Sequence, residues 1–354
     1  MRISRENLKN NRIVRNSYYS LRGLISKKRL WNKAANTLTR FGIDFSSNEE
    51  RDKCISDMIL MNRKYGYGFD EYLYYHFSVK NLAERRSFVA DWEHLGYTCV
   101  MNNPDNSSIF DNKWMTYQTY KEFYKRKVAY CEGDKGLSVF REFVSNHHDF
   151  VLKPLDSSCG HGFQIVHTKD QLCDELYYRI ISNKYNGRFI IEEIIIQSEA
   201  MRKLHPASVN TVRVPTINVG GEINIVHPFL RIGQHGNHVD NAGSGGIICA
   251  LDAETGIVFA AADEHGNRFE KHPDTGEEII GFTVPRWEEA KKIVKELAEI
   301  KPDNHYTGWD LSLTDSGWIL VEANRRGQFI WQIASQVGFR DEVNYYLKQL
   351  GLKY

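Results

Sequence analysis

The sequence lacks the marks of several large classes of protein. It has no run of about 18 apolar residues and no apolar signal-peptide core near its N-terminus, so neither a transmembrane helix nor a secretory leader is expected. Its six cysteines form no Cys-x-x-Cys pair, and its 13 histidines show no His-x-x-x-His spacing. These absences argue against a disulfide framework and a zinc site, and they predict a cytoplasmic protein.

A strong net charge is also absent. The chain has 354 residues, with 46 Lys and Arg against 45 Asp and Glu, which argues against a strongly basic nucleic-acid binder. The charge is nevertheless uneven. Residues 1–40 carry eleven basic residues and one acid, a charge of +10, while the other 314 residues carry 35 basic and 44 acidic residues, a charge of −9.

Helical and extended patterns occupy different parts of the chain. Apolar residues three and four apart predict helices over 8–41, broken near Gly23, and over 48–95, and turn formers at 102–108 mark a boundary. Beyond it we expect helices at 113–147 (with a break at 132–136), 170–183, 286–300 and the C-terminus, and strands at 150–153, 163–167, 188–196, 211–218, 223–232, 246–252, 308–313 and 317–322. This order predicts an α+β fold with an antiparallel sheet in its second half. It also divides the chain into three expected regions, 1–105, 106–196 and 197–354.

The most specific chemical signal is a set of oxygen-bearing side chains on a predicted hairpin. Glu322 and Asn324 alternate along one strand and share a face, and Asp310 joins them from the neighbouring strand if the register allows. Carboxylate and amide oxygens suit Mg²⁺. The alternative is a set of solvated carboxylates, but the apolar strands around them favour half-buried groups that need a counter-ion.

A second signal is Lys153 at a strand end, followed by a loop of small residues at 154–162. The lysine, the serine hydroxyls and the backbone N–H groups near the glycines suit phosphate binding; the loop residues concerned are Ser157, Ser158, Gly160 and Gly162. This is neither a Walker loop nor a dinucleotide fingerprint. An ordinary hairpin turn is an equally good interpretation of this loop taken alone.

Two further stretches combine polar groups with apolar strands. Along 190–197, an adenine could pair with the backbone at Glu193 and Ile195, with Gln197 or the following Glu199 near a ribose; a buried strand with carboxylates at its edge is the alternative. Farther along, Arg213 and Arg231 suit the charge that develops on a transferring phosphoryl group.

Taken in order, these pieces resemble the ATP-grasp superfamily over roughly residues 100–340. The matching pieces are Lys113, Lys153 with its loop, the Glu192-Glu193 strand, Arg213, Arg231 with Asn241 and the pair Gly245-Gly246, and finally Asp310 and Glu322-x-Asn324. The segments 205–213, 272–276, 284–287 and 308–310 look like the branch associated with sugar transfer and polysaccharide biosynthesis. The first 100 or so residues depart from the superfamily, since they show no Gly-rich strand–turn–helix.

The resemblance implies a two-subdomain ATP-grasp fold behind a helix-rich N-terminal region, and it implies roles by position. ATP would be bound by Lys113, Lys153, Ser157, Ser158, Gly160, Gly162, Glu192, Glu193, Ile194, Ile195 and Gln197, and Mg²⁺ by Asp310, Glu322 and Asn324. Lys153, Arg213 and Arg231 would act on the transferred phosphate, and His205, Asn210, Asn241, Gly245, Gly246 and Arg325 would line the substrate region.

The implied activity is the Mg²⁺- and ATP-dependent joining of a carboxylate to an amine through an acylphosphate. The branch suggests that an amino acid or peptide is attached to a sugar-containing cell-envelope or polysaccharide precursor. Two alternatives are open: a small-molecule kinase on the same fold, and a non-catalytic module that binds a polyanion or membrane. Residues 1–40 are interpreted either as a solvated helical face or as a contact with an anionic inner-membrane surface or lipid-linked glycan, and a homodimer is left open.

Overall fold

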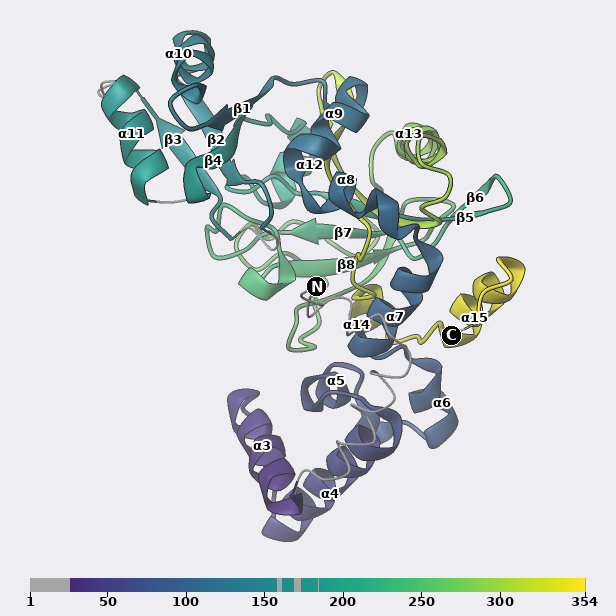
Figure 1. Cartoon of the computed structure of the whole chain (residues 1–354). Coiled ribbons are helices and arrows are strands. Elements are labelled where there is room, and N and C mark those ends of the chain that lie inside the picture. Colours follow the sequence, from purple (N-terminus) through teal and green to yellow (C-terminus); the bar gives the residue numbers. More distant parts are fainter. Residues whose placement is uncertain (1–25, 158–160, 169–172, 184, 354) are drawn as a thin grey trace.

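The computed structural model describes residues 26–157, 161–168, 173–183 and 185–353. Along the chain it passes through a group of helices, a small antiparallel sheet and a large antiparallel sheet (Figure 1). The predicted α+β class is confirmed. The predictions for Ser158, Gly160, most of the basic segment with its helix break near Gly23, and the start of the helix expected at 170–183 lie outside the described residues.

From residue 26 on, the N-terminal region is helical, as predicted. Its elements are α3 (Lys27–Arg40), α4 (Asn48–Tyr65), α5 (Phe69–Tyr74), η1 (Phe77–Val79), α6 (Leu82–Ser87) and α7 (Asp91–Met101). The Ser26 and Ser47 side chains cap α3 and α4, and Gly66 ends α4 with a φ of 80°. The apolar side of α3 is buried at Leu30 and Ala34, which leaves its basic side chains on the exposed side.

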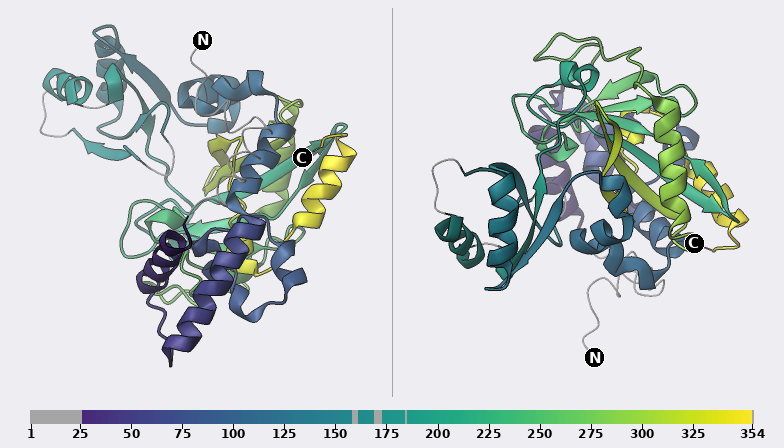
Figure 2. Two further views of the ribbon diagram at one scale, coloured as in Figure 1. Left: turned by 60° about the horizontal axis from the view of Figure 1, so that its bottom comes forward. Right: turned by 90° about the horizontal axis from the view of Figure 1, so that it is seen from above.

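The small sheet stands to one side of the molecule with two helices on one face (Figure 2). Its strands are β1 (Val128–Glu132), β2 (Asp149–Pro154), β3 (Gln164–His167) and β4 (Arg188–Glu193), all antiparallel in the order β1-β4-β2-β3. The covering helices are α10 (Gly136–Asn146) and α11 (Cys173–Asn183), and η3 (Tyr185–Gly187) leads into β4. Phe140, Phe150 and Phe189 lie in their shared core.

The large sheet carries the remaining strands: β5 (Val212–Val219), β6 (Glu222–Ile225), β7 (Phe229–Ile232), β8 (Ile247–Leu251), β9 (Val258–Ala262), β10 (Tyr306–Thr314) and β11 (Gly317–Asn324). Its order is β11-β10-β5-β7-β8-β9, and β6 pairs with β5. The remaining helices are η2 (Pro104–Asn106), α8 (Ser107–Asp111), α9 (Lys113–Tyr124), α12 (Glu199–Leu204), η4 (Ala242–Ser244), α13 (Trp287–Glu299), α14 (Trp331–Ser335) and α15 (Arg340–Gln349).

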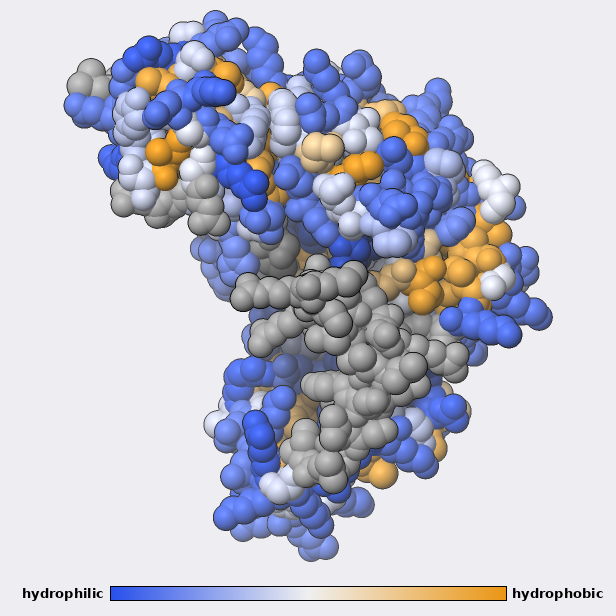
Figure 3. Space-filling model, in the orientation of Figure 1, coloured by the Kyte–Doolittle hydropathy of each residue, from blue (hydrophilic) through white to orange (hydrophobic). Residues whose placement is uncertain are grey.

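Alternation along the strands gives the large sheet two apolar faces. Leu230 belongs to a cluster with Trp287 of α13, whereas its neighbour Phe229 belongs to a cluster with Phe77 and Phe88 of the N-terminal region. The expected region 1–105 therefore shares a core with the large sheet. Polar residues cover most of the face shown in Figure 3.

Several predicted elements differ from the structure. The expected helix 113–147 contains strand β1, and the expected strand 223–232 is two strands, because the chain turns at His227 with a φ of 50° ahead of Pro228. The strand that begins at 188 ends at Glu193 rather than at residue 196, and β9 was not predicted. Among the described residues, no helix is long and apolar enough to cross a membrane.

The shared core makes a testable prediction about stability. Phe77 is fully buried in the cluster that N-terminal residues form together with residues of the large sheet. We expect Phe77→Ala to lower the free energy of unfolding by about 3–5 kcal/mol, because it removes a buried ring and leaves a cavity. The control Val79→Ala, whose side chain is 82% exposed, should change it by less than about 0.5 kcal/mol. Denaturant titration measures both free energies of unfolding, and equal effects would contradict the burial of Phe77 in this cluster.

Candidate active site

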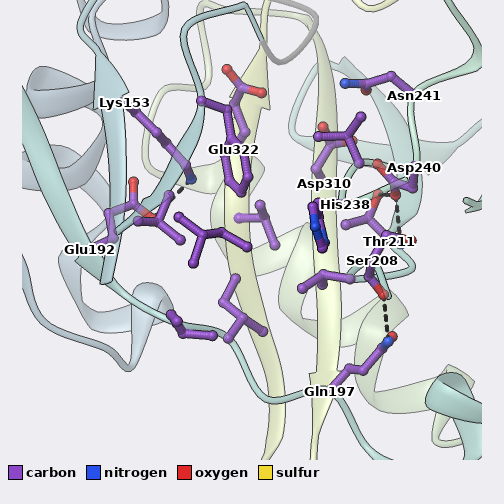
Figure 4. A pocket seen from close by; sticks show the side chains of 18 of the residues that line it. Lys153, Glu192, Gln197, Ser208, Thr211, His238, Asp240, Asn241, Asp310 and Glu322 are labelled. Atoms are coloured by element: carbon purple, nitrogen blue, oxygen red, sulfur yellow. Dashed lines mark hydrogen bonds and ion pairs between the residues drawn. The ribbon is translucent and has the colours of Figure 1, made fainter. Parts of the chain in front are cut away.

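A cavity of about 380 Å³ lies between the small and the large sheet. Its two walls face each other in Figure 4, with Lys153 and Glu192 on one side and Asp310, Glu322 and the loop around Asp240 on the other. None of the described residues before Lys113 lines it. The cavity is therefore built from the segment that resembles the ATP-grasp superfamily.

The small-sheet wall carries a buried carboxylate held between two cations. Glu192 Oε2 accepts hydrogen bonds from Lys153 Nζ at 3.0 Å and from Arg126 Nη2 at 2.8 Å. The side chain of Glu192 is only 4% exposed. Burial would raise the pKa of this carboxyl, but the charges of Lys153 and Arg126 outweigh it and lower the pKa to about 2. Glu192 therefore holds Lys153 in place as an anion.

The large-sheet wall repeats this arrangement around Asp310. Both carboxylate oxygens accept hydrogen bonds from Arg213, and Arg231 Nη2 lies 2.9 Å from Asp310 Oδ2. Burial again opposes ionisation, but the two guanidinium groups keep the pKa of Asp310 below its usual value. Asp240 accepts hydrogen bonds from Thr211 and also lies near Arg231, and its burial raises its pKa.

The predicted metal ligands are neighbours in the structure. Asp310 pairs directly with Glu322 across β10 and β11, and Asn324 Nδ2 donates to Asp310 Oδ2 at 3.3 Å. Lys113 Nζ lies 3.3 Å from Glu322 Oε1 and donates to the Ser157 carbonyl. The described residues hold no cluster of three His, Cys, Asp or Glu, but two carboxylates with an amide are the hard-oxygen donors that fit Mg²⁺.

The predicted phosphate loop borders the same cavity where it is described. Ser157, His161 and Phe163 line the cavity, next to Lys153. Gly162 has a φ of 79°, and a Cβ there would meet Pro154 at 3.0 Å, so a larger residue would strain this turn.

The residues expected around adenine divide into two groups. Ile194 and Ile195 line the cavity just after β4 ends. The two carboxylates beside them are engaged elsewhere: Glu192 with its cations, and Glu193 with the Lys127 N–H at 2.6 Å and with His147 Nε2 at 2.6 Å. The backbone around residue 195 thus stays the predicted adenine contact, and the two acids act as structural anchors.

The polar residues expected near ribose and substrate mostly shape loops. Gln197 donates to the His205 and Ser208 carbonyls, and its oxygen accepts from the N–H of Asn210. Asn210 is fully buried and binds the Met201 and His205 carbonyls. The Gln197 side chain borders the cavity, but its amide nitrogen and oxygen are both engaged by these hydrogen bonds. The structure therefore does not support Gln197 as a ribose ligand.

Of the six expected substrate residues, only Asn241 lines the cavity. The other five lie outside its lining: His205, Asn210, Gly245, Gly246 and Arg325. Arg325 pairs with Asp111, and His205 Nδ1 lies 2.8 Å from Ser208 Oγ. Gly246 is packed so closely that a Cβ would lie 2.3 Å from the Asp240 carbonyl oxygen. Of these five residues, Gly246 packs against the loop that carries Asp240 and Asn241.

Sequence reasoning did not single out Arg126, Thr211 or His238. Thr211 and His238 line the cavity from loops, and Arg126 lies behind Glu192. The basic run 125–127 ahead of a strand was a signal, but the helix predicted over 113–147 concealed it.

Comparison with known proteins identifies the fold. The family model for sugar-transfer associated ATP-grasp matches residues 94–347. The chain belongs to the sugar-transfer associated ATP-grasp family. The predicted superfamily, its branch and the fold of two α+β subdomains preceded by helices are confirmed. A search of curated proteins found no match.

Solved structures similar to this ATP-grasp chain include the ligase PsnB with a minimal precursor, Mg and ADP, at 14% identity and a TM-score of 0.43. Their alignment covers 73% of this chain and 65% of the PsnB chain, so this chain spans less than two thirds of it. D-Alanine-D-alanine ligase from Helicobacter pylori is 12% identical, with a TM-score of 0.43, over 68% of this chain and 60% of its own. Phosphoribosylamine–glycine ligase from Thermotoga maritima is 12% identical, with a TM-score of 0.44. The alignment covers 70% of this chain and 56% of that ligase.

The depressed pKa of Glu192 predicts how stability depends on pH. The folded state holds this pKa at about 2, below its ordinary value of 4.5, so the anion stabilises the fold above pH 4.5. That contribution is lost as the pH falls from about 4.5 to about 2. We expect Glu192→Gln to flatten the loss of stability in this window, as measured by denaturant titration at each pH. The control is Glu278→Gln, at an exposed glutamate. If the stability of the Glu192→Gln variant falls with pH in parallel to that of the control, Glu192 does not have the low pKa assigned to it.

Proposed function

We propose that this ATP-grasp protein is an Mg²⁺- and ATP-dependent ligase that joins a carboxylate to an amine through an acylphosphate. One observation supports this most strongly: Lys153 and the Asp310–Glu322 pair line opposite walls of one cavity. A lysine on one wall and metal-binding oxygens on the other suit a triphosphate that spans the gap.

Each group of residues has a task in this proposal. Lys113 and Lys153 bind the phosphates, and Mg²⁺ held by Asp310, Glu322 and Asn324 supplies charge neutralisation on them. Arg231 borders the cavity and stabilises the negative charge of the transferring phosphoryl group and of the acylphosphate. Arg213 does not line the cavity and acts by fixing Asp310.

Water must be kept from an acylphosphate until the amine attacks it. The carboxylate attacks the γ-phosphate in line and ADP leaves; the amine then attacks the acyl carbon and phosphate leaves. Ser157, His161 and Phe163 border the cavity, and in this proposal they help to exclude water from the site.

We propose an amino acid or peptide and a sugar-containing precursor as the carboxylate and amine partners. The family description, with its association with sugar transfer, supports this class. Contact of residues 1–40 with an anionic membrane or lipid-linked glycan, a homodimer and a cytoplasmic location stay predictions from the sequence. The exposed basic side of α3 is compatible with such a contact.

Glu322→Gln tests the metal and nucleotide assignment. We expect it to lower ADP release by about a hundredfold or more, because the neutral amide binds Mg²⁺ poorly while the side chain keeps its size. The readout is ADP release over a panel of amino acids, amino sugars and uronic sugars, with mass spectrometry of the products. The control is Glu278→Gln, on an exposed glutamate paired with Lys271.

The products decide between reactions. An amide with free phosphate supports the ligase, whereas a stable phosphorylated product identifies a kinase on the same fold. ADP release by Glu322→Gln at the wild-type rate would remove Glu322 from the metal site. Failure of Mg²⁺ with AMPPNP to raise the melting temperature of the wild-type protein would contradict nucleotide binding altogether.

A further inference from the structure

Arg126 occupies the short link between the two sheets. It follows α9, which packs against β11 of the large sheet, and precedes β1 of the small sheet. Its side chain is only 4% exposed. Its guanidinium carbon lies 4.5 Å from the ring centroid of Tyr124. A charged side chain buried at such a crossing needs strong partners on every side.

On the small-sheet side, the partner of Arg126 is Glu192. Arg126 Nε and Nη2 both donate to Glu192 Oε2, at 3.1 Å and 2.8 Å. The same oxygen accepts the hydrogen bond from Lys153 Nζ. The three side chains carry a net charge of +1. With Arg126 present, the charge of Glu192 is already compensated, and Lys153 can offer its own charge to a phosphate.

On the large-sheet side, Arg126 binds the backbone of β11. Its Nη1 donates to the Leu320 carbonyl at 2.6 Å, and its Nη2 lies 3.5 Å from the Val321 carbonyl oxygen. In this region Asp310 pairs with Glu322 and Leu311 pairs with Leu320, so Val321 is the extra residue of a β-bulge. The bulge lies at the sheet edge, where carbonyls lack a strand partner, and directly precedes Glu322.

We propose that Arg126 is a positioning residue that ties the phosphate-binding Lys153, through Glu192, to the bulge that aims Glu322 into the cavity. The inference rests on the proposed function, because it assigns the two tied groups to phosphate and metal. Arg126 itself does not line the cavity, so this role extends the site beyond its lining residues. Arg126 fixes the spacing between the two walls, since its guanidinium binds one group on each.

The test is a double-mutant cycle in nucleotide affinity. The variants are Arg126→Met, Lys153→Met and the double variant, and the probe is AMPPNP with Mg²⁺, titrated by calorimetry. We expect Arg126→Met to weaken binding about tenfold or more. Coupling energies between residues of one contacting network are large enough to produce such a loss. Because Arg126 acts through Lys153, the double variant should bind much more tightly than the product of the two single losses predicts. A merely structural role would make the losses multiply.

Two further variants keep the test decisive. Arg141→Met removes an exposed arginine of the same sheet region, which pairs with Asp174, and should leave affinity unchanged. Arg126→Lys keeps the charge without the forked geometry, so it should also lose affinity, and it replaces Arg126→Met if that variant does not fold.

The outcomes separate this inference from the proposed function. Wild-type affinity in a folded Arg126 variant, or losses that multiply in the cycle, would overturn the positioning role alone. Absence of binding by the wild-type protein would overturn the proposed function, and with it the assignment of Lys153.

Discussion

A carboxylate can be buried beside a cavity only when cations compensate its charge, and this constraint shapes both walls of the site. Glu192 lies between Lys153 and Arg126, and Asp310 lies between Arg213 and Arg231. If one cation were removed, the buried carboxylate would depend on the other cation alone. The side chains that would meet phosphate and metal are therefore held by ion pairs before any ligand binds.

The fold brings these charges together from distant parts of the chain. Arg126 lies 66 residues from Glu192 and 194 residues from Leu320, and it contacts both. The edge position of β11 leaves carbonyls available to it, and the bulge at Val321 turns the strand just ahead of Glu322. Asp310 alternates with Trp309 and Leu311 and so lies on the same face of the large sheet as Tyr306, the face on which the N-terminal helices pack, yet none of the described residues of those helices lines the cavity.

Local patterns were enough to predict part of this site. Alternation along a hairpin placed Glu322 and Asn324 on one face, and the register adds Asp310 as expected. Lys153 at a strand end was likewise a local signal. Arg126 could not be found in this way, because the segment around it was predicted as helix and its partners are distant in sequence. Gln197 and Asn210 appeared free to bind a ligand, since nothing local reveals the carbonyls that occupy their amides.

The most direct test of the account is a crystal structure of the protein with Mg²⁺ and AMPPNP. The account predicts that the phosphates lie between the two walls, in contact with Lys113 and Lys153, and that the metal is bound by Asp310 and Glu322. A nucleotide bound outside this cavity, or a metal that contacts neither carboxylate, would contradict it.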